Sequence, residues 1–274
     1  MAAVTSSSIW YVYGIVPASF SPPSLPPGLD DAAVRLEPYG DVAALVSVLD
    51  EDSYAPTRLE TSSGDVEWLS PRAVAHDRVL TWASDRGAVI PLPMFSLFTG
   101  ANAVRAMLRD RSSQLASTLE RLGEGREYAL RVYRVDNEFL RAITALSPRL
   151  GEMAATAAAA SPGQRYLLER KLEAEKKSEM RAVTQQLVEQ IARDLGAHSI
   201  EQIRSPIPRG ADSSAAPRGT MILNTAFLVA PGSIEAFQQT LTALVERHEP
   251  QGLRFDFTGP WPPYHFVSET GHDS

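Results

Sequence analysis

The sequence predicts an α+β protein of two domains, each an antiparallel or mixed sheet with helices on one face, together with one long amphipathic helix. In the first half of the chain, strand and helix segments follow the order β-β-β-α-β-α-β. That order lacks the regular strand–helix alternation of a doubly wound parallel sheet. The second half repeats the combination of sheet and helix on a smaller scale. A chain of 274 residues is long enough for both domains.

The first domain is expected over residues 1–136 and opens with three strands. The segment 9–16, IWYVYGIV, is rich in aromatic and β-branched residues, which favour strands. Residues 33–50 form two more strands around a turn at 38–41. The second of these, 42–49, is almost wholly apolar, which is typical of a central strand.

Two helices and two further strands complete the first domain. The Ser-Pro pair at 70–71 predicts a helix start, because serine is a good N-cap and proline suits the first helical position. Residues 88–98 form a strand that contains two prolines, so it lies at an edge or ends early. A helix over 101–122 and an alternating strand over 126–136 follow.

The alanine-rich residues 137–161 are expected to connect the two domains, with a short helix at their start. The second domain, 162–274, begins with a long helix over 162–195. Its large apolar side chains recur at steps of three, four or eight: Leu168, Leu172, Met180, Val183, Leu187, Ile191 and Leu195. A helix of this length extends about 50 Å, so part of it must project, bend or face a partner. Its interleaved Lys and Glu favour a solvated, ion-paired face over a carboxylate site.

The rest of the second domain is a strand over 221–231, a helix over 233–248 and an alternating strand over 253–259. Residues 207–219 are rich in Pro, Gly, Ser and Ala, and we expect them to form a mobile loop.

The tail TGPWPPYHF, residues 258–266, combines three prolines with three aromatic side chains. Prolines exclude it from the middle of a helix or sheet. It therefore either closes a core or offers a rigid surface to a partner, and burial of one aromatic side chain, at up to roughly 4–6 kcal/mol, favours core closure. The candidates for partner binding or domain locking are Trp261, Tyr264, Phe266, Leu168, Leu172 and Met180.

Composition argues against several classes of protein. A net charge of −7 gives no basic face for nucleic acid. The absence of cysteine excludes disulfides and Cys-ligated zinc. The sequence has no apolar run of about 18 residues and no basic n-region at its start, so neither a membrane-spanning helix nor a signal peptide is expected. We expect a soluble protein of the cytoplasm.

No catalytic, cofactor-binding or metal site is predicted. Glycine-rich phosphate loops, HExxH and GxSxG are missing. The five histidines are scattered, whereas metal ligands usually occur in close pairs. His76 and Asp77 could form half of a base–orienter pair, but adjacent helical residues point about 100° apart, so a solvated helix face fits them better.

Segments in all parts of the chain resemble the motifs of one family, and they occur in the same order. They are WYVYGIV (10–16), HDRVL (76–80), VIPLPMFSLF (89–98), RLGEGREYALRVYRVD (121–136) and the tail after NTAFLV (224–229). They are similar to the Tyr-x-Tyr-Gly-Ile-Val, His-x-x-Val-Leu, Leu-Pro-Leu-Arg-Phe-Gly, Gly-x-x-Glu-x-x-Leu-x-Val and Pro-Trp-Pro-Pro-Tyr motifs of the GvpF/GvpL family of gas vesicle proteins. Glu127 stands at the acidic position of the fourth motif. One departure is Pro93-Met94-Phe95-Ser96 in place of Arg-Phe-Gly, so no role of that arginine is carried over.

The resemblance implies two α+β domains of ferredoxin-like character and a non-enzymatic accessory or minor structural protein of gas vesicle assembly. Its implied partners are the small hydrophobic, GvpA-like shell subunit and other accessory proteins, which it would help to nucleate or keep from aggregating. Its implied location is the cytoplasm and the gas vesicle, with no cofactor. The partner would dock on a sheet edge or in the groove beside the long helix.

Two other functions stay open at this point. Paired ferredoxin-like domains also suit a small-molecule-binding regulatory protein, which a ligand would stabilise against heat. An enzyme with an unrecognised site is the third reading, although the sequence shows no convergent set of polar residues for it.

Overall fold

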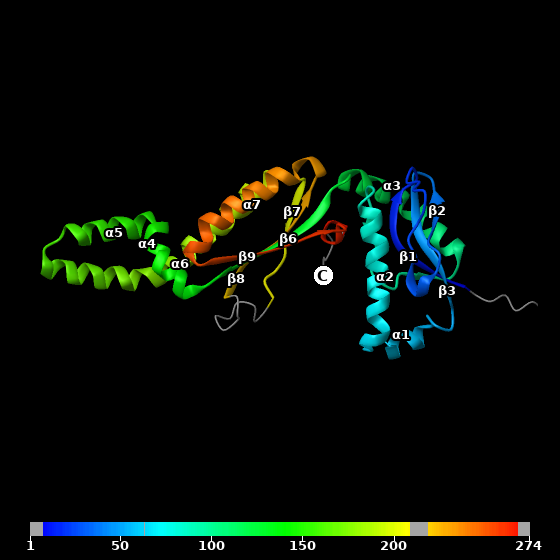
Figure 1. The fold of residues 1–274 in the computed structure, drawn as a ribbon, viewed down its shortest axis with the longest axis horizontal. Coiled ribbons are helices and arrows are strands. Elements are labelled where there is room, and N and C mark those ends of the chain that lie inside the picture. The colour runs from blue at the N-terminus through cyan, green and yellow to red at the C-terminus, as the bar shows by residue number, and fades with distance from the viewer. Residues whose placement is uncertain (1–7, 63, 209–218, 268–274) are drawn as a thin grey trace, which may run out of the picture. The chain divides into compact units, whose positions relative to one another are not determined.

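The computed structural model describes residues 8–62, 64–208 and 219–267, and it divides into two compact units (Figure 1). Unit 1 comprises Met1–Glu127 and Pro260–Ser274, and unit 2 comprises Tyr128–Gly259. The division differs from the expected boundary at residue 136, and the aromatic tail lies in unit 1 from Pro260 onward. The cause is the strand that begins at Arg126, which pairs in the second sheet and not in the first.

Unit 1 contains an antiparallel sheet with strand order β2-β3-β1-β4, and β5 also pairs with β1. The strands are β1 (Ser8–Pro17), β2 (Arg35–Tyr39), β3 (Val42–Asp50), β4 (Ile90–Pro91) and β5 (Leu97–Phe98). The apolar strand β3 lies inside the sheet and the proline-containing β4 is a short edge strand. The sequence predicted both placements correctly.

The helices of unit 1 are α1 (Pro56–Ser62), α2 (Val66–Ser84) and α3 (Ala101–Leu122). Helix α2 begins earlier than the Ser-Pro pair at 70–71 predicted. The Asp65 carboxylate accepts hydrogen bonds from the backbone N–H groups of Glu67 (3.0 Å) and Trp68 (3.3 Å), and Pro71 lies inside the helix. A capping aspartate upstream therefore overrides the later start signal.

The two long helices of unit 1 contact different faces of the sheet. Residues of α2 share one hydrophobic cluster with Tyr11, Tyr13 and Leu45. Helix α3 instead places Arg105 in an ion pair with Glu37, which lies opposite Ala44 in the ladder. Strand side chains alternate between faces, so Ala44 and Leu45 point to opposite sides. The expectation of both helices on one face does not describe this sheet.

Unit 2 has the ferredoxin-like element order β-α-β-β-α-β, as the family resemblance implied. Its strands pair in the order β7-β8-β6-β9. They are β6 (Arg126–Arg134), β7 (Glu201–Arg204), β8 (Thr220–Val229) and β9 (Leu253–Trp261). Strands β6 and β9 each extend by a few residues into unit 1.

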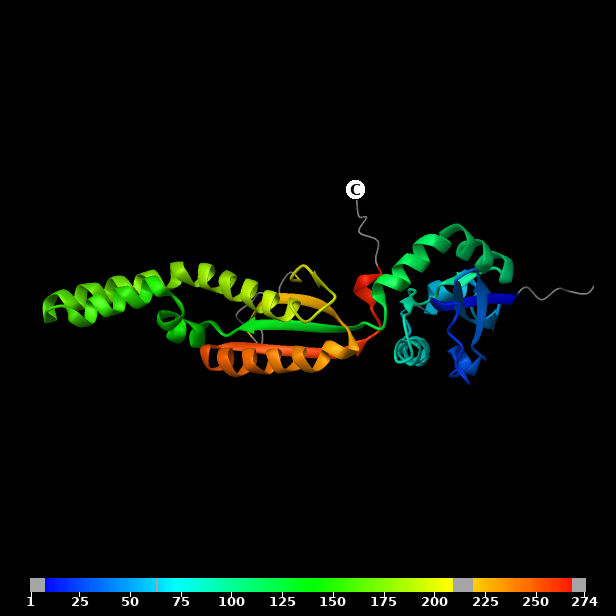
Figure 2. The same cartoon turned by 90° about the horizontal axis from the view of Figure 1, so that it is seen from above.

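The helices of unit 2 are α4 (Asp136–Leu146), α5 (Pro148–Ala159), α6 (Pro162–Gly196) and α7 (Ile234–His248). The long helix is confirmed, but the expected connector is itself helical. Ser147 caps α5 by accepting the N–H of Leu150 at 3.2 Å, and Pro148 occupies the first turn. Alanine is the strongest helix former, so the run that follows continues the helix. Helices α5 and α6 form a hairpin that extends beyond the sheet of unit 2 (Figure 2).

The second half of α6 and helix α7 share one core with the sheet of unit 2. The buried side chains of this core include Leu130, Val132, Val183, Leu187, Ile191, Phe227, Phe237 and Leu241. Most of the segment 207–219, which the sequence predicts to be a mobile loop, lies outside the described residues. Within the part of the chain that is described, no helix is both long and apolar enough to cross a bilayer.

Candidate functional site

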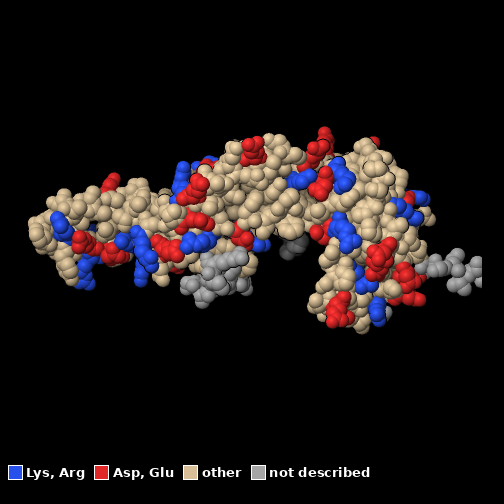
Figure 3. Space-filling model, viewed as in Figure 1, with Lys and Arg blue, Asp and Glu red and all other residues tan. Residues whose placement is uncertain are grey.

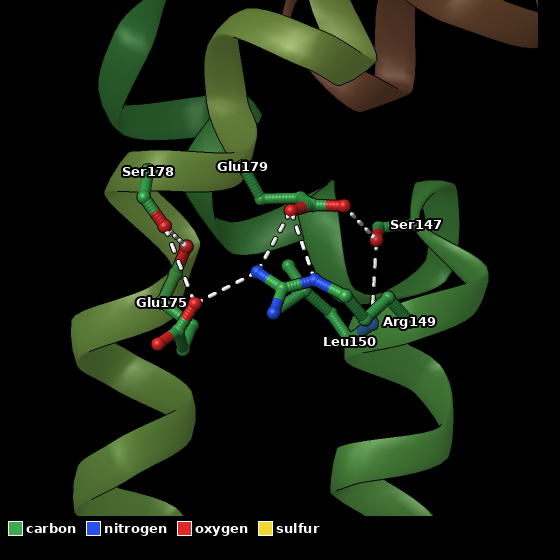
Figure 4. Close-up of polar contacts among 6 residues, drawn as sticks. All are labelled: Ser147, Arg149, Leu150, Glu175, Ser178 and Glu179. Atoms are coloured by element: carbon green, nitrogen blue, oxygen red, sulfur yellow. Dashed lines mark hydrogen bonds and ion pairs between the residues drawn. The ribbon is translucent and has the colours of Figure 1, made fainter.

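An ion-pair cluster fixes the base of the α5–α6 hairpin (Figure 4). Arg149 Nη2 donates to Glu175 Oε2 at 2.7 Å and to Glu179 Oε2 at 2.8 Å, so one guanidinium bridges two turns of α6. Ser147 Oγ donates to Glu179 Oε1 at 3.0 Å. The Arg149 guanidinium lowers the pKa of both carboxyl groups. Because the cluster is exposed to solvent, its main effect is to set the register of the two helices.

The far end of the hairpin carries exposed apolar side chains and no charge over residues 153–164, and the exposed Arg165 that follows donates to the Ala158 carbonyl at 3.0 Å. Tyr166 and Leu167 are 60% and 67% exposed. Beside them on the hairpin are exposed alanines, and we call the set the tip surface: Ala155, Ala158, Ala159, Tyr166 and Leu167. Figure 3 shows mostly uncharged side chains along the upper edge and at the outer end of the hairpin, whereas blue and red side chains interleave along its lower edge. Exposed apolar side chains gathered in one region are characteristic of interaction sites.

The structure does not gather the three candidates of the long helix on one surface. Leu168 is half-buried next to the tip surface. Leu172 is buried in the core of unit 2. Met180 is half-buried two turns further along.

Met180 lines a hollow beside α6, which we call the α6–β8 groove. Its volume is about 400 Å³. The apolar lining consists of Met180, Val188, Ile207, Met221 and Ile222. A hollow therefore lies beside the long helix, where the resemblance implied that a partner docks.

The aromatic tail is bound to unit 1 through a buried carboxylate. Glu127 is 2% exposed and accepts the backbone N–H of His265 at 2.8 Å, and its second oxygen lies 2.6 Å from His265 Nδ1. Tyr264 donates to Asp77 at 3.2 Å. Phe266 is buried, whereas Trp261 is 43% exposed. The tail thus inserts Phe266 into unit 1 and leaves Trp261 at the surface.

Glu127→Gln is expected to destabilise unit 1 by about 1–2 kcal/mol, because a neutral amide replaces a charged acceptor that serves two donors. Urea unfolding followed by tryptophan fluorescence would measure the change. Glu124→Gln removes the same charge from an exposed neighbour and should leave stability unchanged. Equal unfolding midpoints for wild type and Glu127→Gln would show that the tail is not held by this carboxylate.

His76 lies in a buried polar cluster and not on the solvated helix face that the sequence analysis favoured. It is 6% exposed, and Tyr11 Oη lies 2.6 Å from His76 Nδ1. The backbone N–H of Phe95 donates to the same hydroxyl at 3.3 Å. Burial lowers the pKa of His76 to about 4. The only hint in the sequence was the alternation of Tyr11 and Tyr13, which places both hydroxyls on the α2 face of the sheet.

Residue 95 belongs to the segment that departs from the family motif, and it has an unusual backbone. Phe95 adopts a left-handed conformation, with φ of 65°, which is rare for a bulky side chain. Its ring stacks on Trp68 at 5.5 Å between centroids. In the described residues no three His, Asp or Glu side chains are grouped as metal ligands would be.

Comparison with known proteins identifies relatives along almost the full chain. The family described as gas vesicle synthesis protein GvpL/GvpF matches residues 9–268. Gas vesicle protein L of Streptomyces sp. (strain CB03234) is 27% identical over 276 residues, which cover 98% of this chain and 97% of that protein. Gas vesicle protein F of the same strain is 29% identical over 262 residues, covering 94% and 98%.

Two crystal structures share the fold. That of gas vesicle protein GvpF from Anabaena sp. PCC7120 has a TM-score of 0.66 and 18% identity, and the match covers 98% of this chain and 99% of the other. That of GvpF from Microcystis aeruginosa has a TM-score of 0.63 and 20% identity, covering 95% and 99%. At these identities the likeness concerns the fold, whereas the family match concerns the sequence itself. Because that match spans nearly the whole chain, this protein belongs to the GvpL/GvpF family and takes part in gas vesicle formation.

Proposed function

We propose that this protein is a cytoplasmic and gas-vesicle-associated accessory factor that binds the small hydrophobic shell subunit and keeps it from aggregating before it joins the shell. It does so without catalysing a reaction. The tip surface is the observation that carries this proposal. Tyr166 and Leu167 are 60% and 67% exposed on a helical arm, next to a run of residues without charge.

A carrier of an apolar subunit needs an apolar surface that does not collapse on its own core. The hairpin meets this need because α5 and α6 pack along each other and the Arg149 cluster fixes their register. The tip of the hairpin is therefore held away from the sheet of unit 2 (Figure 2). Apolar patches that stay exposed in this way bind partners with complementary apolar surface.

A charge placed in the tip surface should weaken binding of the shell subunit. Leu167→Glu is expected to reduce co-purification of the shell subunit at least about tenfold, because a carboxylate would have to be desolvated in the interface. Both proteins would be co-expressed, the accessory protein captured by an affinity tag, and the retained shell subunit quantified. Light scattering of the shell subunit alone and with each variant would report aggregation.

Val66→Glu is the matched control, because Val66 is 71% exposed against 67% for Leu167 and lies on α2 of unit 1. It adds the same charge to a similarly exposed apolar position. Equal retention of the shell subunit by Leu167→Glu and Val66→Glu would exclude the tip surface. Absence of any retention by the wild type would overturn the proposed function itself.

A further inference from the structure

The α6–β8 groove combines an apolar floor with cations at its rim. Arg134, Lys177 and Arg181 line the same hollow as the apolar side chains. Arg134 is already engaged, because it donates to Asp136 at 2.7 Å and to Thr184 Oγ1 at 2.7 Å. Lys177 and Arg181 are exposed, and within the described part of the chain neither makes an ion pair or hydrogen bond.

Lys177 and Arg181 differ from the ion-paired side chains of α6. Elsewhere on α6, Glu175 and Glu179 are paired with Arg149, Lys176 with Glu173, and Glu189 with Arg204. Lys177 and Arg181 stand four residues apart on one helix face, where two like charges repel each other. An anion bound at the groove would relieve this repulsion. The rim of the groove is therefore complementary to a negatively charged partner.

The lining also indicates the kind of occupant. Met180 and Met221 provide flexible thioethers, which adapt to varied apolar side chains and are common at protein-binding surfaces. The inward-facing Thr184 hydroxyl donates to the Met180 carbonyl at 2.7 Å and so contributes no free polar group for a small ligand. The sequence of residues 209–218, RGADSSAAPR, contains no large apolar side chain to fill such a cavity.

We propose that the α6–β8 groove binds a polypeptide segment of a partner protein in which large apolar side chains stand next to carboxylates. The apolar side chains occupy the cavity among Met180, Val188 and Ile222, and the carboxylates meet Lys177 and Arg181. The groove is separate from the tip surface on α6, and this inference does not depend on what the tip surface binds.

The test uses the full-length protein and a fluorescein-labelled synthetic helical peptide with leucines at i and i+4 and glutamates at neighbouring positions. Fluorescence anisotropy would measure its affinity at low and high salt. Binding should weaken at least about tenfold in the double variant Lys177→Gln/Arg181→Gln, and the salt dependence should largely disappear with the two charges. The same peptide with Gln for Glu, or with Ser for Leu, should bind the wild type weakly.

Arg170→Gln/Lys171→Gln is the matched control, because it removes two exposed charges from α6 outside the groove. It should leave the peptide affinity unchanged, and so should Leu167→Glu, which separates the groove from the proposed function of the tip. Equal binding of the Glu and Gln peptides would overturn the inference. So would decanoate binding as tightly as the peptide and displacing it, since the groove would then be a small-amphiphile site.

Discussion

Replacing Gly252 with alanine is expected to destabilise unit 2 by about 2–5 kcal/mol. Gly252 joins the short 3-10 turn Glu249–Gln251 to β9 with φ of 90°, a left-handed conformation that disfavours other residues. An added Cβ would lie 2.6 Å from the backbone nitrogen of Phe139 and 2.8 Å from Glu138 Cβ. The left-handed alanine costs about 1–2 kcal/mol and the overpacking a further 1–3 kcal/mol.

The clash at Gly252 is difficult to relieve, because backbone hydrogen bonds hold both sides of it. The Val135 N–H donates to the Gly252 carbonyl at 2.8 Å, and the Phe139 N–H donates to the Val135 carbonyl at 2.9 Å. Moving either segment would break one of these bonds. The effect should therefore exceed that of the backbone conformation alone.

Gly40→Ala is the control for the backbone conformation. Gly40 also has a positive φ, 55°, but nothing lies within 4 Å of a Cβ added there. Gly40→Ala should lower the free energy of unfolding by only about 1–2 kcal/mol, which is the cost of the left-handed conformation.

The two units can be followed separately during urea unfolding. All four tryptophans, Trp10, Trp68, Trp82 and Trp261, belong to unit 1, so tryptophan fluorescence reports that unit and far-UV circular dichroism adds the helices of unit 2. Gly252→Ala should move the circular dichroism transition to lower urea by about 1–2 M. If the circular dichroism transition of Gly252→Ala coincides with that of the wild type, the turn can rearrange without loss of stability.

Acidification should destabilise unit 1 through the buried His76 by about 3 kcal/mol. Burial lowers the folded-state pKa of His76 from 6.5 to about 4. Above pH 6.5 the imidazole is neutral in the folded and unfolded states, so stability does not depend on it. Between pH 6.5 and pH 4 only the unfolded state takes up the proton, and stability falls by about 1.4 kcal/mol for each pH unit. Below pH 4 both states are protonated and the loss levels off.

The contribution of His76 can be isolated by comparing wild type with His76→Gln. The imidazole hydrogen bonds to Tyr11 and stacks on the ring of Tyr13. The carboxyl group of Asp77 and a backbone hydrogen bond at Leu92 partly offset the effect of burial on its pKa. Urea midpoints from tryptophan fluorescence at pH 7 and pH 4.5 should diverge less for the Gln variant than for wild type. The same pH dependence in both proteins would assign the acid sensitivity to other groups. Burial also lowers the pKa of His248, so protonation of His248 is destabilising too. His248, however, lies in unit 2.

The sequence predicted elements whose signal is local. Helix 162–196 follows from a sustained apolar stripe, and strand β1 from its aromatic and β-branched residues. The placement of β6 in the second sheet was not predictable in the same way, because a strand carries no local mark of its partner. The α5 helix was missed since its alanine run was interpreted as a linker, although a Ser-Pro pair, Ser147-Pro148, precedes it just as Ser161-Pro162 precedes α6.

The candidate site was predictable only in part, for a similar reason. The charge-free run at 153–164 becomes an exposed tip only because it spans the end of α5 and the start of α6, which form an antiparallel hairpin. The rim of the α6–β8 groove joins Arg134 and Lys177, which are far apart in the sequence. The Tyr11–His76 contact spans 65 positions along the chain, and no periodicity in either segment announces it.

Unit 2 is inserted into unit 1, because the chain leaves unit 1 at Glu127 and returns to it at Pro260. Both crossings fall on neighbouring strands, β6 and β9. A protease that cleaves only one of the two connections would thus leave the two units covalently linked. Cleavage of both connections would be needed to separate them. Residues 128–259 could equally be excised at the gene level and grafted as one cassette into another host, since their ends emerge side by side.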